Sequence, residues 1–396
     1  MRGRYAAALG LAAAMAMAIA ITIAIAIALA PQAAAGPAEA LRGALEALHA
    51  EHGFPGATAA CVLPDGSVVT AATGLADVEA GKPMRPDDRM LAASIGKTFT
   101  GAMMVALAGE GRLGLDDPLA DWLGEEPWYE RLPNHDAITL RHLLRHRSGL
   151  SDHVYDEAFG AGFAQRLATG RSFASRELIG YVLDDEPLFP AGEDFAYTDT
   201  GYVLLGLVIE KATAESYYEG VARRFLEPVG LAQTTPSDRR DLAGLVPGYL
   251  AADNPFGLPA KTLAEDGLLV FHPALEWTAG GFVSNSRDLA HWGAALFGGE
   301  AMPGDYLPLL LASVPIDPER PAARYGLGVA EFRGGHFGDV YGHAGWIPGY
   351  TSSLRHYADH GVTIAFQVNT DIGFTEPGSE LMGEIEARLA QAVIGH

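Results

Sequence analysis

Hydrophobic positions recur with helical spacing at the start of the folded part of the chain. In residues 37–52, Leu41, Leu45 and Leu48 fall on one face of a predicted helix. The apolar runs A-T-A-A-C-V-L and S-V-V-T-A-A-T follow, separated by the turn residues P-D-G, and predict a β-hairpin. T-S-S-L-R-H-Y and V-T-I-A-F-Q-V-N, separated by A-D-H-G, predict a second hairpin near the other end. A helix over about 379–394 closes the chain.

The segment between these ends, about residues 95–320, is rich in helical pattern and loops. Strand-rich ends around a helical middle predict an α+β fold, in which both ends build one antiparallel sheet and the terminal helices cover it. The sheet part is expected at about 36–93 and 321–396, and the inserted, mainly helical part at about 94–320. Functional sites tend to form at such a junction.

Residues 1–35 read as a targeting segment. Arg2 and Arg4 precede an apolar run over residues 6–30, and an A-x-A pattern follows at 33–35. This order is typical of a secretory signal peptide and predicts a secreted or periplasmic protein. The apolar run exceeds most signal cores, so an uncleaved membrane anchor is the alternative.

Charge and cysteine content exclude several classes of protein. The chain of 396 residues has 27 basic and 49 acidic residues and a net charge of −22, which argues against binding to nucleic acid or anionic lipid. We interpret the acidity as an aid to solubility. Cys61 is the only cysteine, so it forms no intramolecular disulfide, and its apolar surroundings predict a buried strand thiol.

The segment S-I-G-K-T-F-T-G at 94–101 admits three interpretations. A phosphate-binding loop would need glycine where Leu91 stands, so it is excluded. A helix cap would explain Ser94 before a helix over 95–110, but not the charged Lys97 at the start of an otherwise apolar helix. A catalytic pair explains both, because residues three apart share a helix face. A partly buried lysine can then accept the serine proton, and the helix N-terminus favours an oxyanion.

Two further segments bring a family resemblance. They are F-A-Y-T-D-T-G-Y-V-L-L-G at 195–206 and Y-G-H-A-G-W-I-P-G-Y at 341–350, supported by L-L-R-H-R-S-G-L, W-T-A-G-G-F-V-S and Y-G-L-G-V. With S-x-x-K, in this order, the chain resembles the serine β-lactamase and penicillin-binding protein superfamily. It is most similar to the branch of class C β-lactamases, secreted D-alanyl-D-alanine carboxypeptidases and related esterases. The resemblance covers nearly everything after the signal segment.

The resemblance implies the roles of four residues. Ser94 is the acylated nucleophile, Lys97 is its general base, and Tyr197 passes the proton to the leaving group. We expect the nearby ammonium to lower the pKa of the Tyr197 phenol. The resemblance places the oxyanion hole at the backbone N–H groups of Ser94 and Trp346.

Two positions depart from the family pattern. Asp199 stands where many relatives have asparagine; it could hold Lys97 charged and shift the base role to Tyr197, or cap a helix starting near Thr200. His343, followed by Ala344 and Gly345, stands where many relatives have K-T-G. If charged, His343 would help to hold a substrate carboxylate; the alternative is an ordinary hydrogen-bonded strand histidine.

The chain is therefore predicted to be an exported serine hydrolase that works through a Ser94 acyl-enzyme. A D-alanyl-D-alanine carboxypeptidase-like activity is the first expectation; an esterase or D-amino-acid amidase is the alternative, then a β-lactamase. A non-catalytic peptidoglycan-binding protein is the alternative from a different class. We expect no metal or organic cofactor, and we assign His142 and His146 to packing and hydrogen bonding. The expected partner is a small molecule or peptide with an acyl group, and the expected state is a monomer.

Overall fold

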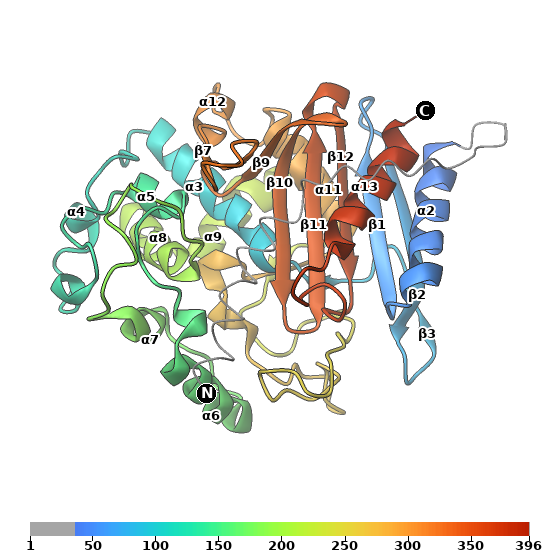
Figure 1. Ribbon diagram of the computed structural model, residues 1–396, viewed down its shortest axis with the longest axis horizontal. Helices are drawn as coiled ribbons and strands as arrows, with labels where there is room; N and C mark the ends of the chain where they lie inside the picture. Colours follow the sequence, from blue (N-terminus) through green and yellow to red (C-terminus); the bar gives the residue numbers. More distant parts are fainter. Residues whose placement is uncertain (1–35, 396) are drawn as a thin grey trace.

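A large antiparallel sheet organises the described part of the molecule. The computed structural model describes residues 36–395, and within them nine strands run in the order β3-β2-β1-β12-β11-β10-β9-β8-β7 (Figure 1). The strands are β1 (Gly56–Val62), β2 (Val68–Asp77), β3 (Lys82–Pro83), β7 (Val314–Pro315), β8 (Ala323–Tyr325), β9 (Ala330–Gly335), β10 (Gly338–Ile347), β11 (Tyr350–Tyr357) and β12 (Val362–Val368). The two ends of the chain meet where Ala57 of β1 lies opposite Val368 of β12. The predicted α+β fold is confirmed.

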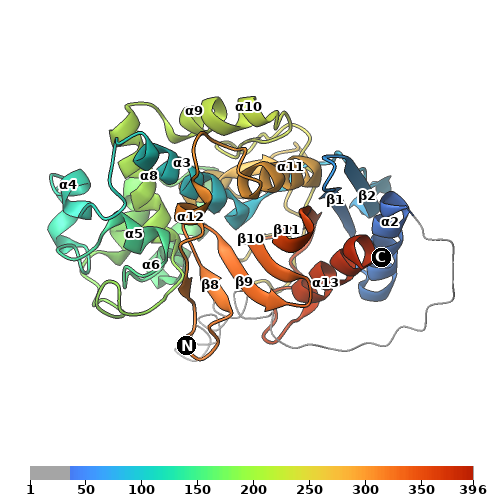
Figure 2. The same cartoon turned by 90° about the horizontal axis from the view of Figure 1, so that it is seen from above.

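Helices cover both faces of this sheet. Strand β1 is buried along its whole length, and its side chains alternate between two clusters. Ala59 and Cys61 belong to the cluster of α2 (Pro37–His52) and α13 (Leu381–Ile394), whereas Ala60 and Val62 belong to the larger cluster of α11 (Ser286–Phe297). Figure 2 shows α11 on one side of β1, β11 and β10, and α2 and α13 on the other. The near-continuous apolar character of β1 follows from this double coverage.

The inserted region packs beside β10 and is mainly helical. Its longest helices are α3 (Lys97–Gly109), α6 (Glu157–Thr169) and α8 (Asp199–Thr213). The shorter helices are α4 (Leu119–Leu123), α5 (Leu140–Leu144), α7 (Ser175–Ile179), α9 (Tyr217–Val221), α10 (Glu227–Val229) and α12 (Leu307–Leu310). A small sheet of β4 (Met90–Leu91), β6 (Phe282–Ser284) and β5 (Thr235–Pro236) joins the chain before Ser94 to this region.

Most predicted elements at the ends of the chain are confirmed. The first helix and both hairpins occur where the pattern placed them, and the last helix begins at Leu381 rather than 379. Cys61 is a buried strand thiol, and burial raises its pKa to about 12. Strands β7 to β10 were not predicted, because they are short or interrupted by glycine. Within residues 36–395, we find no helix with the length and apolarity to cross a membrane; the predicted signal peptide lies outside these residues.

Helix α3 packs directly against the backbone of the segment before β9. A Cβ built on Gly101 would lie 2.0 Å from the carbonyl oxygen of Leu327, whereas one on Gly109, in the same helix, would meet nothing within 4 Å. Glycine at position 101 therefore allows the helix that carries Lys97 to dock on the backbone next to the sheet.

We predict opposite effects for the same substitution at these two glycines. Gly101→Ala should lower the free energy of unfolding by about 1–3 kcal/mol, because backbone must move to admit the methyl group. Gly109→Ala should leave it unchanged or raise it by up to about 1 kcal/mol, as expected for alanine in a helix. Urea denaturation of both variants checks this. Equal stability of the two variants would contradict the close approach.

Candidate active site

Ser94 lies in a tight turn between β4 and α3. Residues Ala93–Gly96 form a 3-10 turn, and the α-helix begins only at Lys97. The hydroxyl of Ser94 caps neither element, so the helix-cap interpretation is wrong. Ala93 has φ 49°, a left-handed conformation that costs free energy for a residue with a side chain. This turn presents Ser94 at the junction of the sheet and the helical region.

Strands β10 and β11 hold this turn in place. Ser352 Oγ on β11 donates a hydrogen bond of 2.8 Å to the carbonyl of Ala92. Opposite Ser352 on β10 lies Gly345, where a Cβ would come within 2.4 Å of the same carbonyl oxygen. Gly345 therefore has a packing role, and the next residue, Trp346, lines the same pocket as Ser94.

Lys97 is fully buried and contacts three oxygen atoms. Its Nζ donates to Ser94 Oγ at 3.1 Å, to Asp199 Oδ1 at 2.5 Å and to the carbonyl of Ala279 at 2.8 Å. These three acceptors match the three N–H donors of an ammonium. The predicted neighbours Ser94 and Lys97 are thus in contact, and the contacts suit a charged lysine.

Asp199 is the first residue of α8, but it does not cap that helix. Thr198 is the cap residue, and its Oγ1 accepts from Thr200 N at 3.2 Å. The carboxylate of Asp199 instead pairs with Lys97, which is the other alternative that the sequence left open. An asparagine here could not supply the negative charge opposite this buried cation.

Tyr197 lies over Lys97, but its acidity is opposite to the prediction. Nζ of Lys97 is 4.8 Å from the centre of the Tyr197 ring, and the ring packs on His146 at a centroid distance of 4.1 Å. Burial raises the pKa of the phenol well above its usual value, the charge of Asp199 adds to this, and a hydrogen bond with Ser94 opposes it. The expected lowering is wrong, since desolvation outweighs the ammonium. Tyr197 is therefore a neutral phenol.

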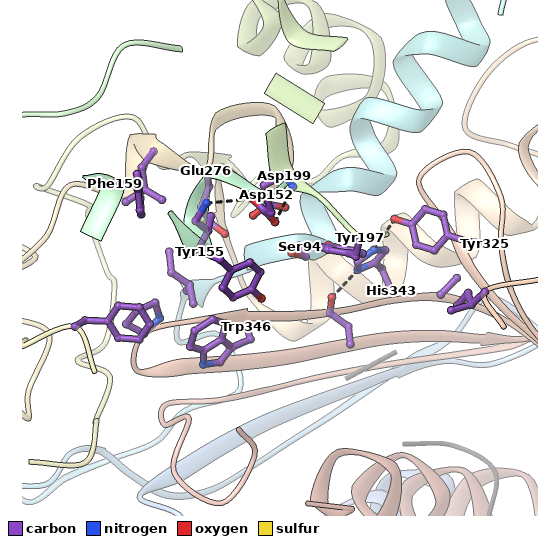
Figure 3. Close-up of a pocket in the computed structure, with 18 of the residues that line it drawn as sticks. Ser94, Asp152, Tyr155, Phe159, Tyr197, Asp199, Glu276, Tyr325, His343 and Trp346 are labelled. Atoms are coloured by element: carbon purple, nitrogen blue, oxygen red, sulfur yellow. Dashed lines mark hydrogen bonds between the residues drawn. The ribbon is translucent and has the colours of Figure 1, made fainter. Parts of the chain in front are cut away.

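His343 is a satisfied, neutral histidine. Tyr325 Oη and His343 Nε2 are 2.8 Å apart, and Nδ1 lies 2.5 Å from the carbonyl oxygen of Ala344 (Figure 3). Nδ1 must carry the proton to donate to this carbonyl, so Nε2 accepts from the tyrosine. Burial lowers the pKa of His343 to about 3. The ring therefore offers no positive charge to a substrate carboxylate, and the structure shows the alternative that the sequence left open, a hydrogen-bonded strand histidine.

The predicted packing role of His146 is confirmed. Its Nδ1 accepts a hydrogen bond of 3.1 Å from Thr198 N, which fixes the segment that carries Tyr197. The nearby His142 instead accepts from Thr139 N at the start of α5.

Two buried carboxyl groups of the site, those of Asp152 and Glu276, were not predicted from the sequence. Asp152 accepts from Asp199 N at 3.0 Å and Val154 N at 3.2 Å, and burial with the charge of Asp199 raises its pKa to about 7. Glu276 is 8 % exposed, and burial, with the charge of Asp199, raises its pKa to about 8 against the attraction of Lys97. A signal existed, because each is an acid next to a quoted family segment, after S-G-L and before W-T-A-G-G.

A pocket of about 170 Å³ opens over Ser94. Asp152, Asp199 and Glu276 gather on one side of the serine (Figure 3). Most of the remaining lining is aromatic or aliphatic, and it includes Phe159, Phe163, Phe256, Phe271, Phe332 and Trp346. The arrangement suits a ligand with a large apolar group and a polar end near the serine.

Among the described residues, the side chains that line this pocket do not bring three ligating atoms close enough together to hold a metal ion. Within residues 36–395, the set of three ligating side chains that lie close enough together for an ion is Glu51, His52 and Glu384 on the surface. Nη1 of Arg388 already contacts both glutamates, at 2.7 and 2.9 Å. This cluster is better described as a surface ion-pair network.

In this site a serine hydroxyl is hydrogen-bonded to a buried lysine, between an antiparallel sheet and a helical region. This arrangement defines a serine hydrolase of the β-lactamase and penicillin-binding protein fold. The comparison with family models agrees, since the model described as "Beta-lactamase" matches residues 41–386. The chain belongs to this family.

Individual relatives fall in several branches of the fold. Penicillin-binding protein 4* of Bacillus subtilis is 24% identical over 310 residues, which are 75% of this chain but 64% of that relative. The chain thus matches less than two thirds of this relative's length. Two solved structures are covered almost completely. A D-stereospecific amidohydrolase from Streptomyces sp. shares 30% identity (TM-score 0.75, 91% of this chain, 99% of the other). The D-amino acid amidase from Ochrobactrum anthropi SV3, complexed with L-phenylalanine amide, shares 25% identity (TM-score 0.74, 90% and 98%).

The raised pKa of Glu276 predicts a loss of stability with rising pH. The unfolded carboxyl releases its proton near pH 4.5, while the folded one retains it up to about 8. Between these values the folded state binds more protons, so the free energy of unfolding falls as pH rises, by at most about 1.4 kcal/mol per pH unit from this group. Glu276→Gln should make the fall shallower. Urea denaturation at several pH values in this window measures both slopes.

The control is Glu125→Gln, which removes an exposed carboxylate beyond α4. It should keep the wild-type slope. The same slope in all three proteins would show that Glu276 ionises freely in the folded state.

Proposed function

We propose that this protein hydrolyses amide bonds of D-configured amino acid derivatives through an acyl-enzyme on Ser94. The observation that carries the proposal is the hydrogen bond between Lys97 and Ser94. Lys97 also pairs with Asp199, and Ser94 and Asp199 line a pocket rich in aromatic side chains. Two structural neighbours that are described as D-stereospecific amidohydrolase and D-amino acid amidase support the amide substrate and its configuration.

The covalent step is an exchange of the amide for an ester. Ser94 Oγ bonds to the amide carbon, and the C–N bond breaks when the leaving nitrogen gains a proton. Lys97 takes the serine proton as its own proton moves along the 2.5 Å contact to Asp199. Tyr197, a neutral phenol whose ring lies over Lys97 and which lines the pocket together with Ser94, delivers a proton to the leaving nitrogen and recovers one from the relay. Water then hydrolyses the ester and restores the serine.

The negative charge of the tetrahedral intermediate needs donors of its own. The backbone N–H groups of Ser94 and Trp346 are our candidates for this oxyanion hole. Both residues line the pocket, and the bond from Ser352 to Ala92 holds the turn of Ser94 against the strand of Trp346.

Carboxypeptidase action on D-alanyl-D-alanine peptides, the first expectation from sequence, receives less support. It needs a cation for the terminal carboxylate of the substrate, and His343 is neutral in the structure. The likeness to a penicillin-binding protein keeps this activity as an outcome of the test.

The first test is the amide itself. Residues 36–396 should release ammonia from D-phenylalaninamide at least about tenfold faster than from the L enantiomer. Ser94→Ala should abolish release, because no other hydroxyl contacts Lys97 in the described residues. An ammonia assay gives both rates, and intact mass after a fluorophosphonate probe should show one adduct that Ser94→Ala lacks. Turnover of N-acyl-D-alanyl-D-alanine without amide turnover would overturn the amidase proposal.

A second test concerns the charge of Asp199. Asp199→Asn keeps the shape of the side chain but leaves the buried Lys97 ammonium without its counter-ion. We expect kcat to fall about 100-fold or more, as for loss of a proton-transfer group, and the free energy of unfolding to fall by about 3–5 kcal/mol. Stopped-time assays and urea denaturation measure the two effects. Asp305→Asn, an exposed neutralisation, is the matched control. An active, stable Asp199→Asn would remove Asp199 from the relay.

A further inference from the structure

Glu276 is a buried acid that the proposed chemistry does not use. It precedes the turn that supplies the Ala279 carbonyl to Lys97, and its side chain lines the pocket beside Ser94. Its Oε2 is buried and has no hydrogen-bond partner among the described residues. An unpartnered buried carboxyl oxygen is costly and calls for a ligand.

The acidic groups around the pocket favour a cation as that ligand. Three carboxyl groups, Asp152, Asp199 and Glu276, line it together. Arg355 is the basic side chain in the lining that carries a fixed charge; it is 4 % exposed, and its Nη2 pairs with Glu386 at 3.0 Å, while its buried Nε has no hydrogen-bond partner among the described residues. Lys97 already donates to three oxygen atoms. An incoming carboxylate would meet acids, whereas an incoming ammonium would meet acceptors.

We propose that Glu276, together with Asp152, binds the free α-ammonium group of the substrate. The inference rests on the proposed amide hydrolysis and adds which end of the substrate residue is free. That residue presents an unblocked amino group, so it is an amino acid amide or the N-terminal residue of a peptide. Its side chain then lies among the phenylalanines of the pocket. N-acylated peptides with a free carboxylate are disfavoured.

Proton release should accompany this binding. The titratable groups that interact with Glu276 are Lys97, Asp199, Tyr197 and Tyr218. In the free site the Glu276 carboxyl is protonated below about pH 8. An ammonium would stabilise the ionised form, so the proton leaves to solvent as the cation binds.

Binding tests this site without turnover. Ser94→Ala should bind D-phenylalaninamide at least about tenfold more tightly than 3-phenylpropanamide, which lacks the amino group. Adding Glu276→Gln should remove this preference and leave the affinity for 3-phenylpropanamide unchanged. Calorimetry in two buffers with different ionisation enthalpies should show proton release on binding D-phenylalaninamide, and its loss with Glu276→Gln. Adding Glu125→Gln instead should change none of these values.

Turnover separates the two proposals. With Ser94 intact, Glu276→Gln should lower kcat/KM for D-phenylalaninamide about 10- to 100-fold and spare labelling by the fluorophosphonate probe. If the wild type hydrolyses amides but treats D-phenylalaninamide, its N-acetyl form and 3-phenylpropanamide alike, the ammonium site is wrong and the amidase stands. If no amide is cleaved but the ammonium preference in binding holds, the amidase fails alone. Equal losses for charged and uncharged ligands would mean that Glu276 only shapes the pocket.

Discussion

The buried ammonium of Lys97 is the interaction on which the site depends. A fully buried cation is tolerated only where an opposite charge and further acceptors replace its water shell. Here the acceptors come from three parts of the chain: the turn of Ser94, the start of α8 at Asp199, and the turn that ends at Ala279. The nucleophile therefore sits where these three segments meet.

A chain of hydroxyl groups holds these segments in register. Thr100 Oγ1 on α3 donates to the carbonyl of Thr278, and Thr278 Oγ1 donates to the carbonyl of Tyr202 on α8, each at 2.7 Å. The backbone turn at Thr278 is therefore hydrogen-bonded to both α3 and α8, next to the Ala279 carbonyl that contacts Lys97. Because each bond is buried, the loss of a partner would leave an unsatisfied polar group, and this keeps the positions of Ala279 and Asp199 fixed around Nζ.

The sequence predicted the ends of the fold better than its middle, for a physical reason. The helical spacing of residues 37–52 is a local signal, and so are the apolar runs of the two hairpins, which the turn residues P-D-G and A-D-H-G separate. Strand β10 carries three glycines and draws its stability from β9 and β11, so it has no such signal. In the site, spacing predicted that Ser94 and Lys97 touch. It could not predict the neutral His343 and Tyr197, because a pKa depends on burial, which only the packed structure defines.

Strain and charge are concentrated at the same place. Ala93 and Trp277 both have positive φ, 49° and 35°, although neither is glycine, and they open the two turns that meet at Lys97. Beside them, Asp199 pairs with Lys97, while Asp152 and Glu276 line the same pocket, and burial raises the pKa of both of these acids. If only stability mattered at this site, we would expect a relaxed backbone and neutral residues in place of these acids. Their presence beside Ser94 offers acceptor oxygens to a positively charged ligand, and an ammonium bound there would favour their ionised forms.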